Sequence, residues 1–255
     1  MEIENLLRSF VEQCKEEYGP NLRSLVLTGS YARGEAIEDS DLDIYCFFGE
    51  LHSSHMIAMG GIVSRLSEAY PGIEINTQCL TVDEYARQGF GTHFVTPLLH
   101  LDGKLLYGDS VTCEPTAEEV IALIEFIVSN CVMSTRHYIA AQEPAAELAK
   151  GRLKRWSLKP LCTALKLERY LFTRDYPLTY RDLLTSIEDG SPSCEAAEWI
   201  VDPEKFKNDI YRNSGDVLAK LVGIGSEVSQ KVAAFKENHI LNKPSSDASM
   251  DQIGR

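Results

Sequence analysis

Two short motifs lie close together in the sequence and together suggest a metal and phosphate site. The first is Gly29-Ser30, where glycine permits a tight turn and serine can begin a short helix whose free N–H groups suit a phosphate. The second is Asp41 and Asp43, which point to the same side if they lie in a strand. Two carboxylates with no basic residue between them repel each other unless a divalent cation binds them, and hard oxygen ligands beside phosphate favour Mg²⁺.

The surrounding pattern predicts alternating helices and strands that would position these motifs. Apolar residues recur at helical spacing over 2–18, and the strand bearing Asp41 and Asp43 presents Leu42, Ile44 and Cys46 on its opposite face. The remaining elements predicted for this half are strands at 22–28, 41–48, 73–80 and 103–108, and helices at 53–70 (interrupted at Gly60-Gly61), 82–89 and 93–100.

A third acid is expected near the pair. Glu74 lies early on the polar face of the predicted strand 73–80, which should neighbour the strand bearing Asp41 and Asp43. Asp83 and Glu84 are alternatives, but they begin a predicted helix, where acids often serve only the helix dipole.

Strand signals end near residue 112, and the second half predicts helices alone. Thr116 and Glu119 form a capping box that opens a helix to about 142. Further helices are predicted at 151–173 (bent or restarted at Pro160), from 179, and at 203–237. We therefore expect an N-terminal domain at 1–112, a helical bundle at 113–242 and a disordered tail at 243–255.

Composition limits the class of partner. The 255 residues carry a formal charge of −13, which disfavours binding along a nucleic-acid backbone. No apolar run reaches the length that spans a membrane, and seven scattered cysteines without a C-x-x-C pair are typical of core residues in a reducing compartment. We expect a cytoplasmic protein that binds neither nucleic acid nor membrane.

The spacing Gly29-Ser30-x-x-Arg33-Gly34-x5-Ser40-Asp41-x-Asp43 resembles the nucleotidyltransferase superfamily related to DNA polymerase β. The resemblance implies an α/β (α+β) nucleotidyltransferase domain with a short mixed sheet, an NTP such as ATP as co-substrate, and two Mg²⁺ ions held by Asp41 and Asp43. It implies that Glu74 completes the acidic cluster as metal ligand or general base. Gly29, Ser30, Arg33 and Ser40 would bind the nucleotide, although Arg33 could instead pair with Glu35 at the surface.

The all-helical second half makes the layout similar to antibiotic nucleotidyltransferases, especially aminoglycoside adenylyltransferases. One helix of that half is rich in basic residues, and Arg155 and Lys159 are the candidates for reaching the triphosphate; a solvated helix face is the alternative. The basic residues, which share this stretch with the single acid Glu168, are Lys150, Arg152, Lys154, Arg155, Lys159, Lys166, Arg169 and Arg174.

The leading hypothesis is transfer of a nucleoside monophosphate, AMP from ATP, to a hydroxyl of a small molecule such as an aminoglycoside antibiotic, with release of pyrophosphate. Two alternatives stay open: nucleotide addition to a partner protein of the toxin–antitoxin type, and a non-catalytic nucleotide-binding regulatory module. The net charge offers no basic track for a polymerase product. The sequence allows either a monomer or a homodimer.

Overall fold

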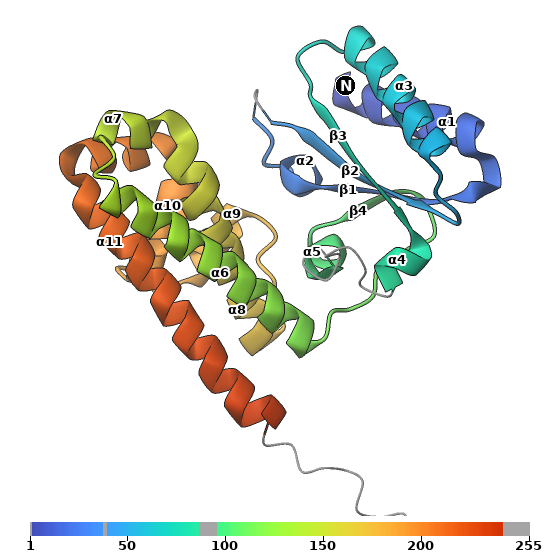
Figure 1. Cartoon of the computed structure of the whole chain (residues 1–255). Helices are drawn as coiled ribbons and strands as arrows, with labels where there is room; N and C mark the ends of the chain where they lie inside the picture. Colours follow the sequence, from blue (N-terminus) through green and yellow to red (C-terminus); the bar gives the residue numbers. More distant parts are fainter. Residues whose placement is uncertain (1, 38–39, 87–95, 242–255) are drawn as a thin grey trace, which may run out of the picture. The chain divides into compact units, whose positions relative to one another are not determined.

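The computed structural model describes residues 2–37, 40–86 and 96–241, and these residues form two compact units (Figure 1). The first unit comprises residues 1–123 together with Tyr176–Leu183, and the second comprises Ile124–Asp175 and the chain from Leu184 onward. The eight residues Tyr176–Leu183 come from the half of the sequence that was expected to be the helical bundle, yet they belong to the compact unit that holds the sheet.

A mixed four-stranded sheet forms the centre of the first unit, in the order β3-β2-β1-β4. Strands β1 and β2 are antiparallel, as are β1 and β4, whereas β2 and β3 are parallel. The strands are β1 (Leu22–Thr28), β2 (Leu42–Phe48), β3 (Ile75–Thr81) and β4 (Lys104–Gly108). The predicted mixed sheet is therefore confirmed.

Alternation along the strands creates two different faces. Leu42, Ile44 and Cys46 join the core formed with helices α1 (Glu2–Tyr18) and α3 (Ser53–Ala69). The opposite face carries a smaller core of Val26, Phe47, Tyr85 and Leu99, the last two from helices α4 (Val82–Ala86) and α5 (Thr96–Leu101). Asp43 lies on the same face as Phe47, four residues further along β2. The candidate metal-binding carboxylate is therefore on the face that carries the smaller apolar core.

One predicted break is wrong. Gly60 and Gly61 lie inside α3, which runs without interruption. Each glycine costs a helix up to about 1 kcal/mol relative to alanine, but Met59, Ile62 and Leu66 of the same helix are buried against the sheet. Burial of this apolar stripe offsets the unfavourable propensity. The expected ends of the helices at 82–89 and 93–100 lie partly outside the described residues, as does the tail from 243.

The described residues of the second unit form helices joined by short turns and contain no strand, which confirms the predicted helical half. The predicted capping box at the start of α6 is present in the last residues of the first unit: the Thr116 N–H donates to Glu119 Oε2 at 2.7 Å and the Glu119 N–H to Thr116 Oγ1 at 3.2 Å. At the expected bend or restart the helix only changes type, because the π-helical turn η4 passes into α8 at Lys159, one residue before Pro160, with helical φ and ψ at Leu158 and Lys159. The break in helical geometry lies earlier, at Gly151, which has a φ of +99°. The elements of the second unit, with those at its border, are α6 (Ala117–Ala140), α7 (Ala145–Glu147), η3 (Leu148–Arg152), η4 (Lys154–Leu158), α8 (Lys159–Thr173), α9 (Tyr180–Ser186), α10 (Pro192–Val201), α11 (Pro203–Lys236) and η5 (Glu237–Leu241).

Helix α10 escaped prediction, although Ser191 caps it by accepting the Cys194 N–H and Pro192 occupies its first turn. Among the described residues, no helix combines the length and the hydrophobicity that a membrane span requires.

Candidate functional site

The Gly-Ser turn and the second aspartate are in direct contact. Strand β1 ends at Thr28, whose partner across the antiparallel pair is Asp43. Gly29 then turns the chain with a φ of +72°, and a Cβ added to it would lie 2.7 Å from Asp43 Oδ2. The positive φ favours glycine at this position, and any larger residue would displace the carboxylate of Asp43. The turn predicted to bind phosphate and a carboxylate predicted to bind metal are thus adjacent.

Asn76 completes this arrangement on the neighbouring strand. In the parallel pairing of β2 with β3, Asn76 lies opposite Asp43. Its Nδ2 donates to Oδ2 of Asp41, which precedes β2, at 3.0 Å. The amide therefore fixes the orientation of one aspartate while standing beside the other. Asn76 shares the polar face of its strand with Glu74, but an amide carries no charge that would signal a metal site in the sequence.

The third acid lies at the edge of this group. Glu74 precedes β3, its side chain is exposed, and its carbonyl accepts the Leu42 N–H at 2.8 Å. Its role as metal ligand or base stays a prediction. Of the alternatives, Glu84 accepts the Thr81 N–H at 2.7 Å and caps α4, while Asp83 is exposed in the first turn of that helix.

The donor set suits Mg²⁺ bound together with a substrate. Within the described ranges, no group of three or more His, Cys, Asp or Glu side chains is arranged to hold a metal ion. Mg²⁺, however, is usually held by one or two carboxylates plus phosphate oxygens and water. Asp41 and Asp43 fit that pattern. The negative charge of Asp43 is also felt by Tyr45, two residues along the same strand face, whose pKa is raised first by burial and then by Asp43.

Ser30 and Ser40 occupy the turns that flank the aspartates. Ser30 is the second residue of helix α2 (Gly29–Arg33), and its carbonyl accepts the Glu35 N–H at 2.9 Å. The Ser40 hydroxyl accepts the Ile37 N–H at 2.9 Å, and the Ser40 N–H donates to the Ile37 carbonyl at 2.9 Å. Ser40 thus shapes the approach to Asp41, and direct contact of either serine with a nucleotide stays a prediction.

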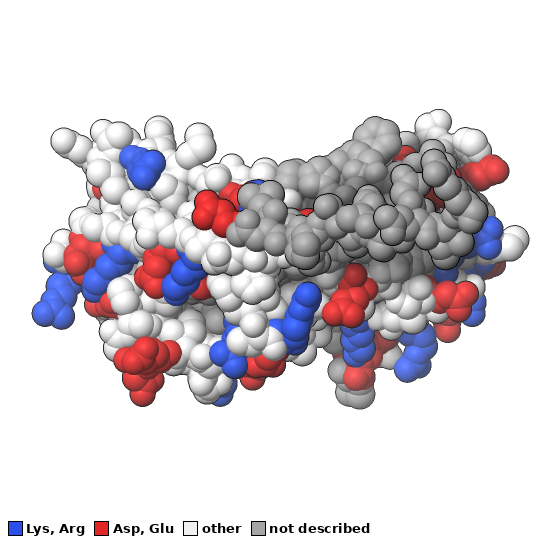
Figure 2. Space-filling model, turned by 90° about the horizontal axis from the view of Figure 1, so that it is seen from below, with Lys and Arg blue, Asp and Glu red and all other residues white. Residues whose placement is uncertain are grey.

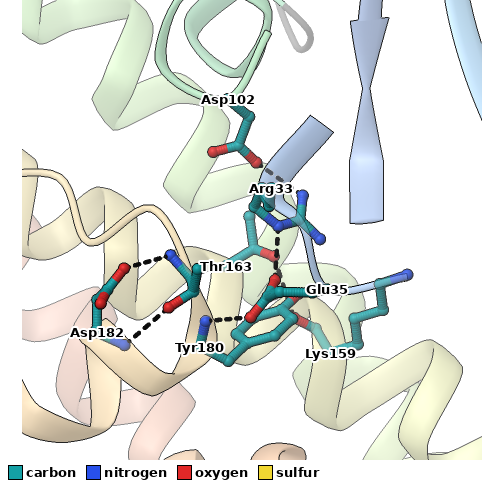
Figure 3. Close-up of polar contacts among 8 residues, drawn as sticks. Arg33, Glu35, Asp102, Lys159, Thr163, Tyr180 and Asp182 are labelled. Carbon is teal, nitrogen blue, oxygen red and sulfur yellow. Dashed lines mark hydrogen bonds and ion pairs between the residues drawn. The ribbon is translucent and has the colours of Figure 1, made fainter. Parts of the chain in front are cut away.

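Arg33 is buried and paired with two carboxylates (Figure 3). Its Nε donates to Glu35 Oε2 at 2.8 Å and its Nη1 to Asp102 Oδ2 at 2.9 Å, and its side chain is only 7% exposed. Burial acts to lower its pKa, but Tyr180, the hydrogen bond to Glu35 and the charge of Asp102 together raise it, so the guanidinium stays charged. The pairing with Glu35 that the sequence allowed is present, but it is buried rather than at the surface.

Arg155 and Lys159 belong to the second unit. Lys159 is the first residue of α8 and is exposed. Arg155 is also exposed, and its guanidinium lies over the ring of Trp156, 5.4 Å from the centroid. Their predicted contact with the triphosphate stays a prediction.

Lysines on the surface of the second unit form ion pairs with nearby carboxylates. Lys220 pairs with Glu195 at 2.8 Å, and Lys231 pairs with Glu227 at 2.8 Å. On the face that Figure 2 shows, basic and acidic side chains are mixed and form no continuous basic track.

Comparison with known proteins agrees with this arrangement. Residues 7–85, which include the Gly-Ser turn, both aspartates and Asn76, match the family described as nucleotidyltransferase domain. This stretch of the chain is therefore a nucleotidyltransferase domain, as its motif predicted.

More specific likenesses differ in extent. The chain is similar to protein adenylyltransferase MntA of Thermococcus cleftensis, with 44% identity over 52 residues, which is 20% of this chain and 50% of that protein. Proteins of Methanocaldococcus jannaschii align at up to 48% identity, in that case over 42 residues, 16% of this chain and 29% of theirs. The chain thus spans half or less of the length of these two relatives.

A solved structure matches nearly the whole fold. Spectinomycin adenyltransferase AAD(9) from Enterococcus faecialis, determined with ATP and spectinomycin, aligns with a TM-score of 0.54. The alignment covers 90% of this chain and 99% of that one, at 10% identity. The predicted architecture of a nucleotidyltransferase domain followed by a helical region is confirmed as a fold.

Proposed function

We propose that this protein transfers AMP from ATP to a hydroxyl group of a small molecule, with release of pyrophosphate. The contact between Gly29 and the carboxylate of Asp43 carries the proposal, because it joins the turn assigned to the triphosphate to a carboxylate that we assign to the metal. Asp41 and Asp43 would hold two Mg²⁺ ions, which stabilise the attacking and leaving oxygens of an in-line displacement when bound. Asn76 orients Asp41, and Glu74 would accept the proton of the acceptor hydroxyl.

A small-molecule acceptor is supported by the likeness to AAD(9), which extends through the helical half and not only through the nucleotidyltransferase domain. Spectinomycin and aminoglycosides are therefore the first acceptors to test. The acidic composition of the chain, with 38 acidic against 25 basic residues, suits a cationic acceptor.

A second candidate function is AMP transfer to a partner protein. It is supported by the 44% identity to protein adenylyltransferase MntA over 52 residues. The chemistry at the donor side would be the same, and the acceptor would be a side-chain hydroxyl of the partner.

The test is incubation of the protein with ATP labelled at the α-phosphate, Mg²⁺, and either a panel of spectinomycin and aminoglycosides or a cell extract. Label on a small molecule supports the first candidate, and label on a protein band supports the second. Asp43→Asn should abolish either transfer. The matched control is Asp175→Asn, since Asp175 pairs with Arg169 at 2.9 Å in the second unit and is 67% exposed. Retained transfer in Asp43→Asn would refute the metal assignment.

A further inference from the structure

The helix that carries the Gly-Ser turn depends on its surroundings for its shape. Helix α2 has five residues, too few to be stable without tertiary contacts. It is followed by Gly34, which caps its C-terminus with a left-handed φ of +73°. At its start Gly29 abuts Asp43, so that end is fixed by the metal-binding strand. The contacts that hold the other end determine where the turn points.

Arg33, the last residue of α2, provides these contacts. It bridges Glu35, which follows the helix, and Asp102, which lies between α5 and β4 (Figure 3). The side chains of Arg33 and Asp102 are each 7% exposed, and that of Glu35 is 19% exposed. Buried charges are costly when they lose a partner, so this group strongly favours one geometry.

The network continues to a segment far downstream in the sequence. Glu35 Oε1 accepts the backbone N–H of Tyr180 at 2.5 Å, across 145 residues of sequence. Tyr180 is the first residue of α9, preceded by Thr179, which forms a reciprocal capping pair with Asp182. The N–H at this helical position has no partner within its own helix, and a carboxylate there is favoured by the helix dipole.

Two aromatic residues of the same segment complete the group. The guanidinium of Arg33 lies 5.5 Å from the centre of the Tyr180 ring. The pKa of Tyr176 is raised first by burial and then by the charge of the Asp102 carboxylate, so its side chain lies within the electrostatic reach of this group. All these residues belong to the first compact unit.

We propose that Arg33 and Glu35 are positioning residues that anchor the Gly29–Ser30 turn to the segment Tyr176–Leu183, which thereby completes the nucleotide-binding half of the site. This inference rests on the proposed function. It assigns Arg33 an action through the turn instead of direct contact with phosphate, because its charge is already shared by two carboxylates. The nucleotide-binding half of the site then depends on Tyr176–Leu183, a segment well beyond the predicted domain boundary at residue 112.

The decisive experiment compares Tyr180→Pro with Tyr180→Ala in the full-length protein. Both variants lose the aromatic ring, but only proline removes the N–H that Glu35 accepts. Proline is tolerated at the first position of a helix, so α9 should persist. We expect Tyr180→Pro to bind Mg·ATP about tenfold more weakly than Tyr180→Ala, as loss of a hydrogen bond to a charged acceptor implies. Amide hydrogen exchange over residues 29–34 should be faster in Tyr180→Pro, without a general loss of protection.

If Tyr180→Pro does not fold, a comparison of Glu35→Gln with Asp175→Asn tests the same anchoring. Glu35→Gln keeps an oxygen for the Tyr180 N–H but removes the charge that faces Arg33, and it should weaken Mg·ATP binding and speed exchange over residues 29–34. Asp175→Asn makes the same chemical change to the exposed partner of Arg169 and should alter neither quantity.

These outcomes separate the inference from the proposed function. If the wild-type protein binds Mg·ATP without transferring AMP, the proposed transfer is wrong, while nucleotide affinity and hydrogen exchange still test the anchoring. If the wild-type protein transfers AMP but the two Tyr180 variants have equal affinities and equal exchange rates, the anchoring is wrong. The anchoring is also wrong if Glu35→Gln behaves like Asp175→Asn.

Discussion

The Cα of Gly29 faces the carboxylate of Asp43 so closely that a Cβ would lie 2.7 Å from Oδ2. A side chain at position 29 would therefore collide with this carboxylate unless the carboxylate moved. This spacing makes the position of the aspartate sensitive to the first residue of the turn, even though the two residues lie on different elements.

Gly29→Ala should therefore damage both stability and activity. A non-glycine residue at a strained positive φ costs on the order of 1–3 kcal/mol, and displacement of Asp43 by about 1 Å should lower kcat roughly 100-fold. Thermal unfolding and AMP-transfer assays measure the two effects. Gly60→Ala is the control: Gly60 lies inside α3 with no atom within 4 Å of an added Cβ, so this change should stabilise the protein by up to about 1 kcal/mol.

Asn76→Asp should make stability depend on Mg²⁺. The Asn76 amide now donates to Asp41 at 3.0 Å, and a carboxylate in its place would repel that aspartate unless a cation lies between them. Without Mg²⁺ the Tm should fall by roughly 2–4 °C for each kcal/mol lost, and added Mg²⁺ should raise the Tm of the variant more than that of the wild type. Gln78→Glu adds the same charge two residues along β3 on the same face and should show a smaller response to Mg²⁺. Equal responses of the two variants would contradict a metal site at Asp41.

The cysteines should differ in reactivity because the thiolate is the reactive form. Burial raises the pKa of Cys14 and of Cys131 to about 12. The pKa of Cys79 is instead lowered, chiefly by a hydrogen bond with Cys46, its partner on the adjacent strand. Iodoacetamide at pH 8 should therefore label exposed Cys113 and half-buried Cys79 well before Cys14 and Cys131. Peptide mass spectrometry over time measures the order, and early labelling of Cys14 would contradict the described packing of α1.

Glu168 should give the helical unit a pH-dependent stability. Burial raises its pKa, while Lys231, 3.3 Å away, partly opposes that shift. Because the folded-state pKa lies above the unfolded value of about 4.3, the native state binds this proton more tightly. The contribution of Glu168 to stability is therefore greatest below the unfolded pKa and falls as pH rises through the raised folded-state pKa.

Glu168→Gln removes this titration. Urea unfolding at several pH values from 4 to 7 should show the variant gaining stability relative to the wild type as pH rises. Glu227→Gln removes the other carboxylate that pairs with Lys231, one that is 51% exposed, and should show a weaker trend. A difference between wild type and Glu168→Gln that does not change with pH would contradict the assignment.

The sheet and the Gly-Ser turn could be predicted because their signals are local. Period-two alternation along Asp41 to Phe48 and the turn at Gly29 each depend on neighbouring residues alone, and the structure places β1, α2 and β2 where these patterns indicated. The contact between Gly29 and Asp43 follows from the pairing of two consecutive strands.

Features that depend on distant partners could not be predicted. Asn76 acquires its role only through the parallel register that puts it beside Asp43. Arg33 could be read as a phosphate ligand or as a surface partner of Glu35, because its second carboxylate lies 69 residues away. The link from Glu35 to Tyr180 uses a backbone N–H, a group that every residue except proline possesses and that leaves no trace in the sequence.

Because Tyr176–Leu183 belongs to the unit that holds the sheet, it also affects the order in which that unit folds during translation. During synthesis the four strands and both aspartates leave the ribosome first, yet the partner of Glu35 is added 145 residues later. Contacts between residues so far apart in sequence form late, because closing a long loop costs chain entropy. A nascent chain that ends before α9 would thus hold a folded sheet without its anchored turn, and nucleotide binding would begin only after the first part of the helical unit, Ile124–Asp175, had been translated.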